Sequence, residues 1–130
     1  MLGTMHLMLL ACKQAPPHEL HAQALALPAV EAAELCPKIA TPELRADCTW
    51  RVVEELAAED PVRATALCTE LPGTFGHECW FLLAENGDEP SACANAGPMA
   101  DDCRMHLVGR RLMTLQGGFD DDSDAEQVFI

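Results

Sequence analysis

Aromatic residues are scarce in this chain of 130 residues, which has no tyrosine, four phenylalanines and two tryptophans. The core must therefore be built from alanine, leucine and valine, each of which buries a modest area. The apolar share of 49% is still enough for a folded domain, and the length allows one small domain rather than two. We expect a domain that needs stabilisation beyond apolar packing.

Basic residues are also few, because 8 Lys and Arg stand against 21 Asp and Glu, a net charge of −13. This balance argues against nucleic acid as a partner, since phosphate binding needs clustered Lys and Arg. A run of 18 or more apolar residues is absent, so no membrane-spanning helix is predicted. The sequence shows no glycine-rich phosphate loop and no hydrolase constellation, and it indicates no cofactor.

A short apolar stretch near the N-terminus ends in residues 9–12, Leu-Leu-Ala-Cys. It resembles the lipobox of bacterial lipoproteins, in which a Leu, a small or apolar residue and a small residue precede a Cys. The resemblance implies that residues 1–11 are a signal peptide and that Cys12 is the first mature residue and the lipidation site. Two or three acyl chains anchor a protein stably where one does not. Lys13 stands where the family's inner-membrane retention signal has Asp, which implies a lipid-anchored envelope protein of the outer membrane.

Residues 12–27 follow as a segment that we interpret as the lipidated Cys and a flexible tether. The pair Pro16-Pro17 is interpreted as a helix stop. His18 and His21 are three residues apart, so on one helical turn they could coordinate a metal ion, but the sequence offers no third ligand beside them. We interpret both histidines as solvated surface residues.

Residues 118–130 are predicted to be an acidic disordered tail. The spacing of Asp120, Asp122 and Asp124 imitates the start of a calcium-binding loop, although Ala125 stands where that loop needs glycine. Weak binding of a divalent cation is the alternative interpretation of this tail.

Six cysteines remain after Cys12, in three successive pairs with 11, 10 and 9 residues between the partners. The midpoint of each pair falls on a chain-reversal signal, at Pro42, beside Gly73 and at Pro98. Residues equidistant from a turn face each other in an antiparallel hairpin, so among 15 connectivities we expect nearest-neighbour pairing. The predicted disulfides are Cys36–Cys48, Cys68–Cys79 and Cys93–Cys103.

Other roles for these six cysteines are weighed against disulfides. Zinc sites and redox sites usually show the spacing C-x-x-C, which does not occur here. Reduced core thiols in a cytosolic helical bundle form a further alternative. Disulfides agree best with the lipobox, because they need an oxidising compartment and the lipobox independently predicts export to one. Each closed loop should contribute roughly 2.5–3 kcal/mol.

Apolar residues recur with helical period around the cysteines, and no long segment alternates with period two. The expected helices span 29–36, 42–58, 61–71, 74–85, 89–95 and 99–115. The predicted fold class is all-α, with residues 28–117 forming three consecutive antiparallel helical hairpins, each stapled by a disulfide. Loosely, this is similar in architecture to the helical-hairpin repeats of Sel1-like and tetratricopeptide proteins.

The last expected helix carries an apolar stripe that we expect to face its packing partner. The stripe comprises Cys103, Leu107, Val108, Leu112 and Leu115.

Two pairs of residues are candidates for function. Trp50 and Trp80 occupy neighbouring positions in the first two repeats, where they either pack between hairpins or line a groove for a partner. His77 and His106 lie close to cysteines and carboxylates, and could serve a metal-dependent or enzymatic activity. We expect a non-enzymatic, lipid-anchored binding or structural module whose partner is an unidentified envelope protein. The alternatives are an activity that uses these histidines, and a cytosolic bundle with free thiols.

Overall fold

The computed structural model describes residues 15–116, and every regular element in this part of the chain is helical. The α-helices are α2 (Pro17–Leu25), α3 (Ala29–Leu35), α4 (Pro42–Leu56), α5 (Pro61–Thr69), α6 (Gly73–Gly87) and α7 (Ala100–Leu115). Short 3₁₀ helices lie between them: η1 (Cys36–Lys38), η2 (Pro90–Asn95) and η3 (Gly97–Met99). The all-α class is confirmed for the described residues.

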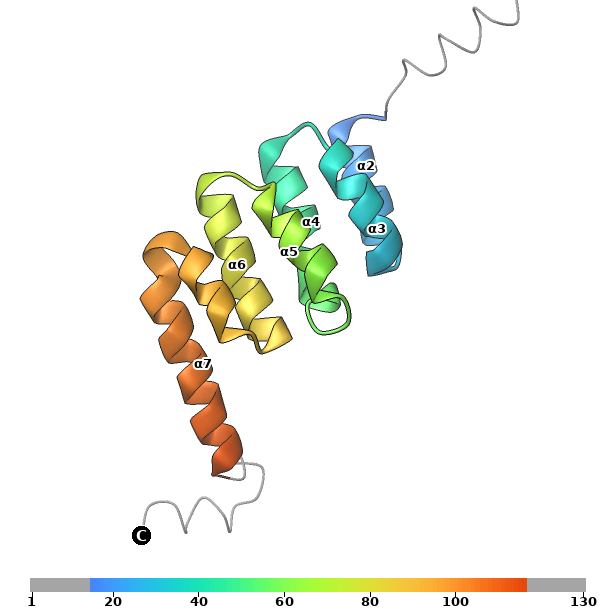
Figure 1. Cartoon of the computed structure of the whole chain (residues 1–130). Coiled ribbons are helices and arrows are strands. Elements are labelled where there is room, and N and C mark those ends of the chain that lie inside the picture. Colours follow the sequence, from blue (N-terminus) through green and yellow to red (C-terminus); the bar gives the residue numbers. More distant parts are fainter. Residues whose placement is uncertain (1–14, 117–130) are drawn as a thin grey trace, which may run out of the picture.

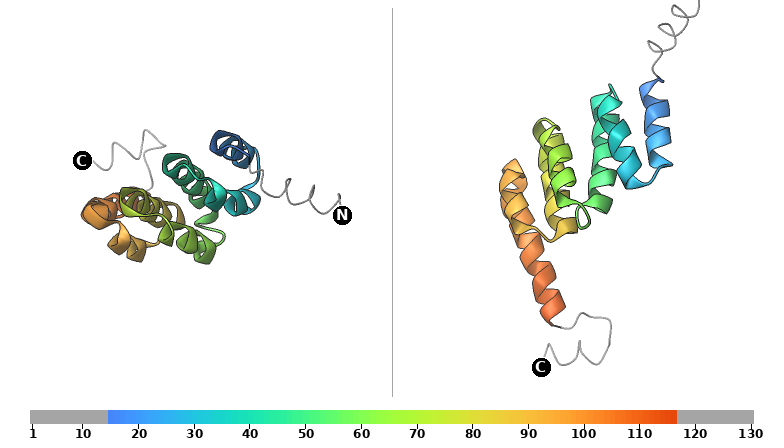
Figure 2. Two further views of the ribbon diagram at one scale, coloured as in Figure 1. Left: turned by 90° about the horizontal axis from the view of Figure 1, so that it is seen from above. Right: turned by 45° about the vertical axis from the view of Figure 1, so that its right-hand side comes forward.

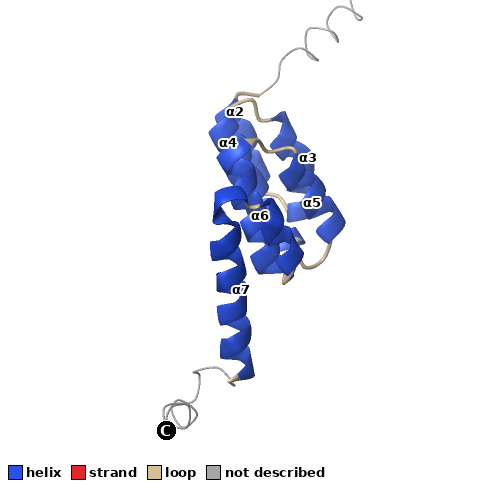
Figure 3. Cartoon of the chain, turned by 60° about the vertical axis from the view of Figure 1, so that its left-hand side comes forward, coloured by secondary structure: helices blue, strands red, loops and turns tan. Residues whose placement is uncertain are grey.

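The helices alternate between two layers along the chain (Figures 1 and 2). The helices α2, α4, α6 and α7 stand side by side in one layer, and α3, α5 and η2 cover them in the other. Each element contacts its neighbours in this order: α4 packs against α2, α3, α5 and α6, and α6 packs against α7 and η2. The described part is thus an elongated stack, and Figure 3 shows that α7 extends beyond its body.

Proline sets the start of several helices. Proline begins α2, α4 and α5, at Pro17, Pro42 and Pro61. At this position a backbone N–H would have no partner within the helix, so its absence in proline costs no hydrogen bond. Asp60 caps α5, because its side chain accepts a hydrogen bond from the backbone N–H of Arg63 at 3.2 Å. These local signals explain why the predicted starts of α4 and α5 agree with the structure to within a residue.

The expected tether is wrong for residues 17–25, which form α2 rather than a flexible segment. Pro17 begins this helix instead of stopping one, and Ala24 is buried against the rest of the stack. The helix expected at 89–95 is the 3₁₀ helix η2. The set of helices therefore differs from the six predicted at these two places.

The core is made of small side chains and sulfur. The largest side chains that are fully buried are Ile39, Val53, Leu56 and the six paired cysteines. The aromatic side chains Trp50, Phe75, Trp80 and Phe81 are only partly buried and pack around this core. In an aromatic-poor domain, the disulfides therefore occupy the positions that large apolar side chains usually fill.

Candidate functional site

Three disulfides link elements that follow one another along the chain. They are Cys36–Cys48, Cys68–Cys79 and Cys93–Cys103, with Cα–Cα distances of 5.5, 5.3 and 5.5 Å. They join η1 to α4, α5 to α6, and η2 to α7, and these are the pairs that the turn positions predicted. None of these six cysteines keeps a thiol that could act as a nucleophile. Cys12 lies outside the described residues, as do the predicted tail and its aspartates.

Trp50 uses its polar atom inside the stack. Its Nε1–H donates a hydrogen bond to the carbonyl oxygen of Phe75 at 3.0 Å, and the two ring centroids are 5.9 Å apart. This contact joins α4 to α6. Trp80 is partly buried and packs against the core. Both positions suit packing between successive helices, and a role of the tryptophans in partner binding stays a prediction.

The histidines proposed for an enzymatic alternative lie in separate settings. The ring of His77 lies against Gly97, since a Cβ atom built there would be 2.5 Å from Nε2 of His77. His106 lies on α7, with Nε2 at 3.4 Å from Oε1 of Glu85 and its ring 5.7 Å from that of Phe81. Within residues 15–116, no group of three or more His, Cys, Asp and Glu side chains is arranged to hold a metal ion.

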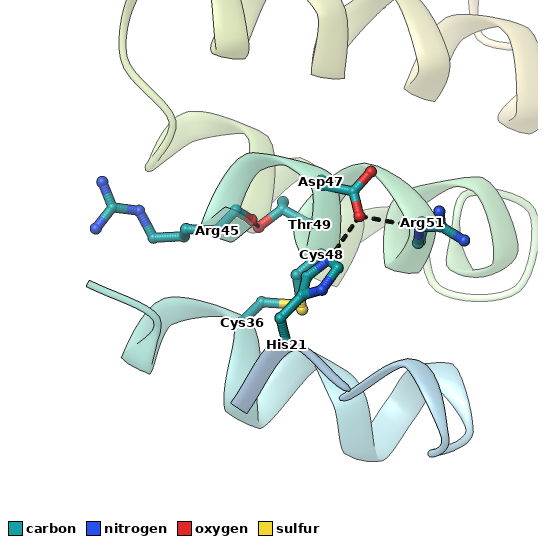
Figure 4. The surroundings of a disulfide bond; sticks show 7 residues. All are labelled: His21, Cys36, Arg45, Asp47, Cys48, Thr49 and Arg51. Carbon is teal, nitrogen blue, oxygen red and sulfur yellow. Dashed lines mark hydrogen bonds and ion pairs between the residues drawn. A yellow bond between two sulfur atoms is a disulfide. The ribbon is translucent and has the colours of Figure 1, made fainter. Parts of the chain in front are cut away.

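A charged cluster beside the first disulfide was not predicted (Figure 4). Nε2–H of His21 donates to Oδ2 of Asp47 at 2.6 Å, and Nε of Arg51 donates to the same oxygen at 3.1 Å. Burial raises the pKa of Asp47, but the hydrogen bonds from His21 and Arg51 outweigh it, so the pKa of this carboxyl is lowered. The side chain of His21 is only 17% exposed, so it is not the solvated residue that its sequence context indicated.

The largest departure from expectation lies on α7. Cys103 and Leu107 are buried as predicted, but Val108, Leu112 and Leu115 are 56%, 53% and 83% exposed. The expected stripe is therefore wrong in its second half, because Val108, Leu112 and Leu115 lie about 100–160° around the helix from the buried side of α7.

These exposed side chains form one face together with Met105, which is 73% exposed. At 100° per residue, Met105, Val108, Leu112 and Leu115 fall within an arc of about 80°. We call this surface the α7 face. It points away from the buried side of α7 by about 140°, and no described element covers it.

Arginine lines one edge of the α7 face. Arg104 and Arg111 are seven residues apart, so they lie one above the other, and their side chains are 52% and 56% exposed. Arg104 pairs with Asp101 at 3.1 Å and Arg111 with Asp88 at 3.5 Å, both at the surface. Surface pairs of this kind contribute about 0–1 kcal/mol, which leaves both guanidinium groups able to exchange partners.

Gly109 lies at the other edge of the α7 face. A Cβ atom added there would meet nothing within 4 Å, so the packing of the described residues does not require a glycine. Glycine inside a helix costs roughly 1 kcal/mol relative to alanine. Here it leaves room for another backbone to approach α7 closely.

No protein-family model matches the chain, and searches of curated proteins and of solved structures give no significant match. None of the described helices is long and apolar enough to cross a bilayer.

Proposed function

We propose that this protein is a non-enzymatic, lipid-anchored protein of the cell envelope that binds another envelope protein through the α7 face. The observation that carries the proposal is the exposure of Met105, Val108, Leu112 and Leu115 on one stripe of a projecting helix. Contiguous exposed apolar surface marks interaction sites in soluble domains. The buried cysteines and separated histidines supply no comparable grouping for chemistry.

The three disulfides support an exported location, because such bonds persist in oxidising compartments. The similarity of residues 9–12 to a lipobox supports lipidation of Cys12 in the same compartment. We therefore propose an envelope location, and Lys13 directly after the proposed lipid site favours the outer membrane as the anchored surface.

We also propose that the stack consists of three consecutive hairpins, each stapled once: α3–α4, α5–α6 and η2–α7. The disulfides support this division, since each one joins the two elements of a pair, the first through η1 at the end of α3. In this arrangement, the α7 face is the open end of the layer formed by α2, α4, α6 and α7, where a further helix would continue the stack.

Location is tested on protein made in its bacterial host and alkylated rapidly before extraction. Intact mass should show that six cysteines resist alkylation and react with the reagent only after their disulfides are reduced. Metabolic labelling with a fatty acid should mark the wild type but not Cys12→Ala. Six alkylated cysteines would place the protein in a reducing compartment, and equal labelling of both proteins would remove Cys12 as the lipid site.

Binding is tested by placing a photo-crosslinking amino acid at Leu112 in cells. Val62 on α5 is the matched control position, because it is an apolar side chain that is 81% exposed and lies outside the α7 face. We expect a discrete adduct with an envelope protein from position 112 and none from position 62. Identical patterns from both positions would contradict the proposal.

A pull-down from envelope fractions separates the α7 face from the tryptophans. The bait proteins are the wild type, Leu112→Glu, and a variant with both Trp50→Ala and Trp80→Ala. Loss of the partner with Leu112→Glu alone supports the α7 face. Loss with the tryptophan variant alone, in protein shown to be folded by circular dichroism, would move the site to the tryptophans.

A further inference from the structure

The spacing of the α7 face is that of a helix-pairing seam. Its four exposed residues, Met105, Val108, Leu112 and Leu115, are separated by three, four and three positions. This is the a and d pattern of a coiled coil, in which a second helix packs its own side chains between those of the first. The seam runs over eleven residues, about 15 Å from first to last at a rise of about 1.5 Å per residue, which suits a partner segment of about three helical turns.

The charged side chains within the seam segment are basic, although Arg104 and Arg111 also pair at the surface with Asp101 and Asp88. Arg104 and Arg111 immediately precede the first and third seam residues, so they take the flanking g positions of successive heptads. Residues 104–115 contain no Asp or Glu, although the whole chain has a net charge of −13. Flanking charges choose the partner of a coiled coil, so this edge favours a helix with acidic side chains.

Three other occupants fit less well. A second copy packed antiparallel would set the arginine edges of both copies against each other. An anionic lipid surface would attract the arginines but repel the acidic residues 120–126, which closely follow α7. The chain's own tail has its large apolar side chains at Phe119 and at residues 128–130 with none between them, so it lacks the spacing of three and four positions that the seam requires.

We infer that the α7 face takes one helix of a partner protein, whose apolar stripe packs between Met105 and Leu115 and whose acidic flank pairs with Arg104 and Arg111. This inference rests on the proposed function and specifies the partner's chemistry. Gly109 allows the close approach of that helix at the edge opposite the arginines.

The test uses two designed helical peptides with identical leucine seams, one flanked by glutamate and the other by lysine. Each labelled peptide is titrated with the full chain, and binding is followed by fluorescence anisotropy. We expect the acidic peptide to bind about tenfold more tightly or better, and its affinity to fall as salt is added. Leu112→Glu should abolish binding, and Val62→Glu should leave it unchanged.

Charge reversal gives the sharpest readout. In a variant carrying Arg104→Glu and Arg111→Glu, the preference should pass to the lysine-flanked peptide. A general loss of folding cannot produce such a reversal. Equal affinity for the two peptides, binding of neither, or an unreversed preference would each overturn the inference.

The other candidate occupants of the α7 face are a second copy, an anionic lipid surface and the chain's own tail, and the same variants test each of them. Three results would each overturn the inference. The first is a dimer in sedimentation that Leu112→Glu abolishes, and the second is phosphatidylglycerol-vesicle binding that depends on Leu112 without peptide binding. The third is a tenfold gain in affinity for both the acidic and the lysine-flanked peptide when the aspartates of the tail become asparagine, since only a tail that occupies the seam would hinder both. If position 112 still crosslinks to an envelope protein, the proposed function stands while the inference fails. If no crosslink forms, the proposed function fails on its own test.

Discussion

Nε2 of His21 lies 2.6 Å from Oδ2 of Asp47, and this contact fixes α2 to α4 across 26 positions of sequence. Arg51, one turn beyond Asp47 on α4, donates to the same carboxylate oxygen. Burial raises the pKa of Asp47, but the hydrogen bonds from His21 and Arg51 lower it by more, so it lies below its ordinary value. A carboxylate thus holds the first described helix in place.

The first prediction concerns pH. Because the pKa of Asp47 is lower in the folded protein, its ionisation stabilises the fold above the ordinary aspartate value of about 3.9. That contribution is lost as the pH falls through the lowered pKa of the folded state. Asp47→Asn should therefore reduce the free energy of unfolding near neutral pH by about 0.5–1 kcal/mol, and the difference from wild type should shrink towards pH 3. Urea denaturation at both pH values measures this.

The control for Asp47→Asn is Asp101→Asn, because Asp101 carries a 94% exposed carboxylate on α7. Hydrogen exchange adds a local readout, since Asp47→Asn should speed exchange in α2 and leave α6 unchanged. A pH-independent loss of stability, or equal changes in both helices, would contradict the role given to this contact.

The second prediction concerns the disulfide that holds α7. Cys93 and Cys103 are 10 positions apart, and their bond links the short helix η2 to α7. Replacing both with alanine should cost about 2.7 kcal/mol by loop-closure entropy. Exchange should rise first in η2 and α7, because the remaining contacts of α7 are with α6 and η3. Equal rises in α3 and α4 would show instead that the stack unfolds as one unit.

The third prediction compares two glycines with left-handed backbone. Gly73 and Gly97 have φ values of +53° and +55°, but only Gly97 lies against a side chain, the ring of His77. Gly73→Ala should cost about 1–2 kcal/mol of conformational strain, and Gly97→Ala should cost more because of the clash. Urea denaturation of each variant gives the difference.

A double-mutant cycle isolates the clash at Gly97. Adding His77→Ala to Gly97→Ala should remove the excess cost and leave the cost seen for Gly73→Ala. Equal costs for the two single glycine variants would show that the ring of His77 moves aside freely.

The fourth prediction concerns Trp50. Trp50→Phe keeps an aromatic ring beside Phe75 but removes the Nε1–H that donates to its carbonyl oxygen. We expect a loss of about 1 kcal/mol in the free energy of unfolding, with no effect on peptide binding at the α7 face. Thermal denaturation measures the first and anisotropy the second. A loss of peptide binding would connect the tryptophan to the site.

Sequence reasoning succeeds here where the signal is local. Pro42, Pro61 and the cap at Asp60 define helix starts by their own chemistry, and the three cysteine pairs are spaced about turns that the chain marks. The disulfide pairing follows from neighbours along the chain, so it needs no knowledge of distant contacts.

The failures arise where a signal has two meanings that only distant residues decide. Pro17 can end a segment or begin a helix, and here the packing of Ala24 and the contact with Asp47 favour the helix. The apolar residues of α7 likewise fall on two sides. The bond from Cys103 to Cys93 turns one side inward, and Leu112 and its companions are left exposed.

The serial order of the disulfides bears on how the protein is made. Each bond joins a cysteine to the next one along the chain, 10 to 12 positions away, and none crosses to another pair. In a chain that emerges N-terminus first, an oxidant that links cysteines in order of arrival would produce the native pattern without slow reshuffling. Pairing in order of arrival gives the native disulfides only if Cys36 is the first cysteine with a free thiol. A free thiol at Cys12 would compete with Cys48 for Cys36, so the proposed acylation of Cys12 would also protect the order of pairing.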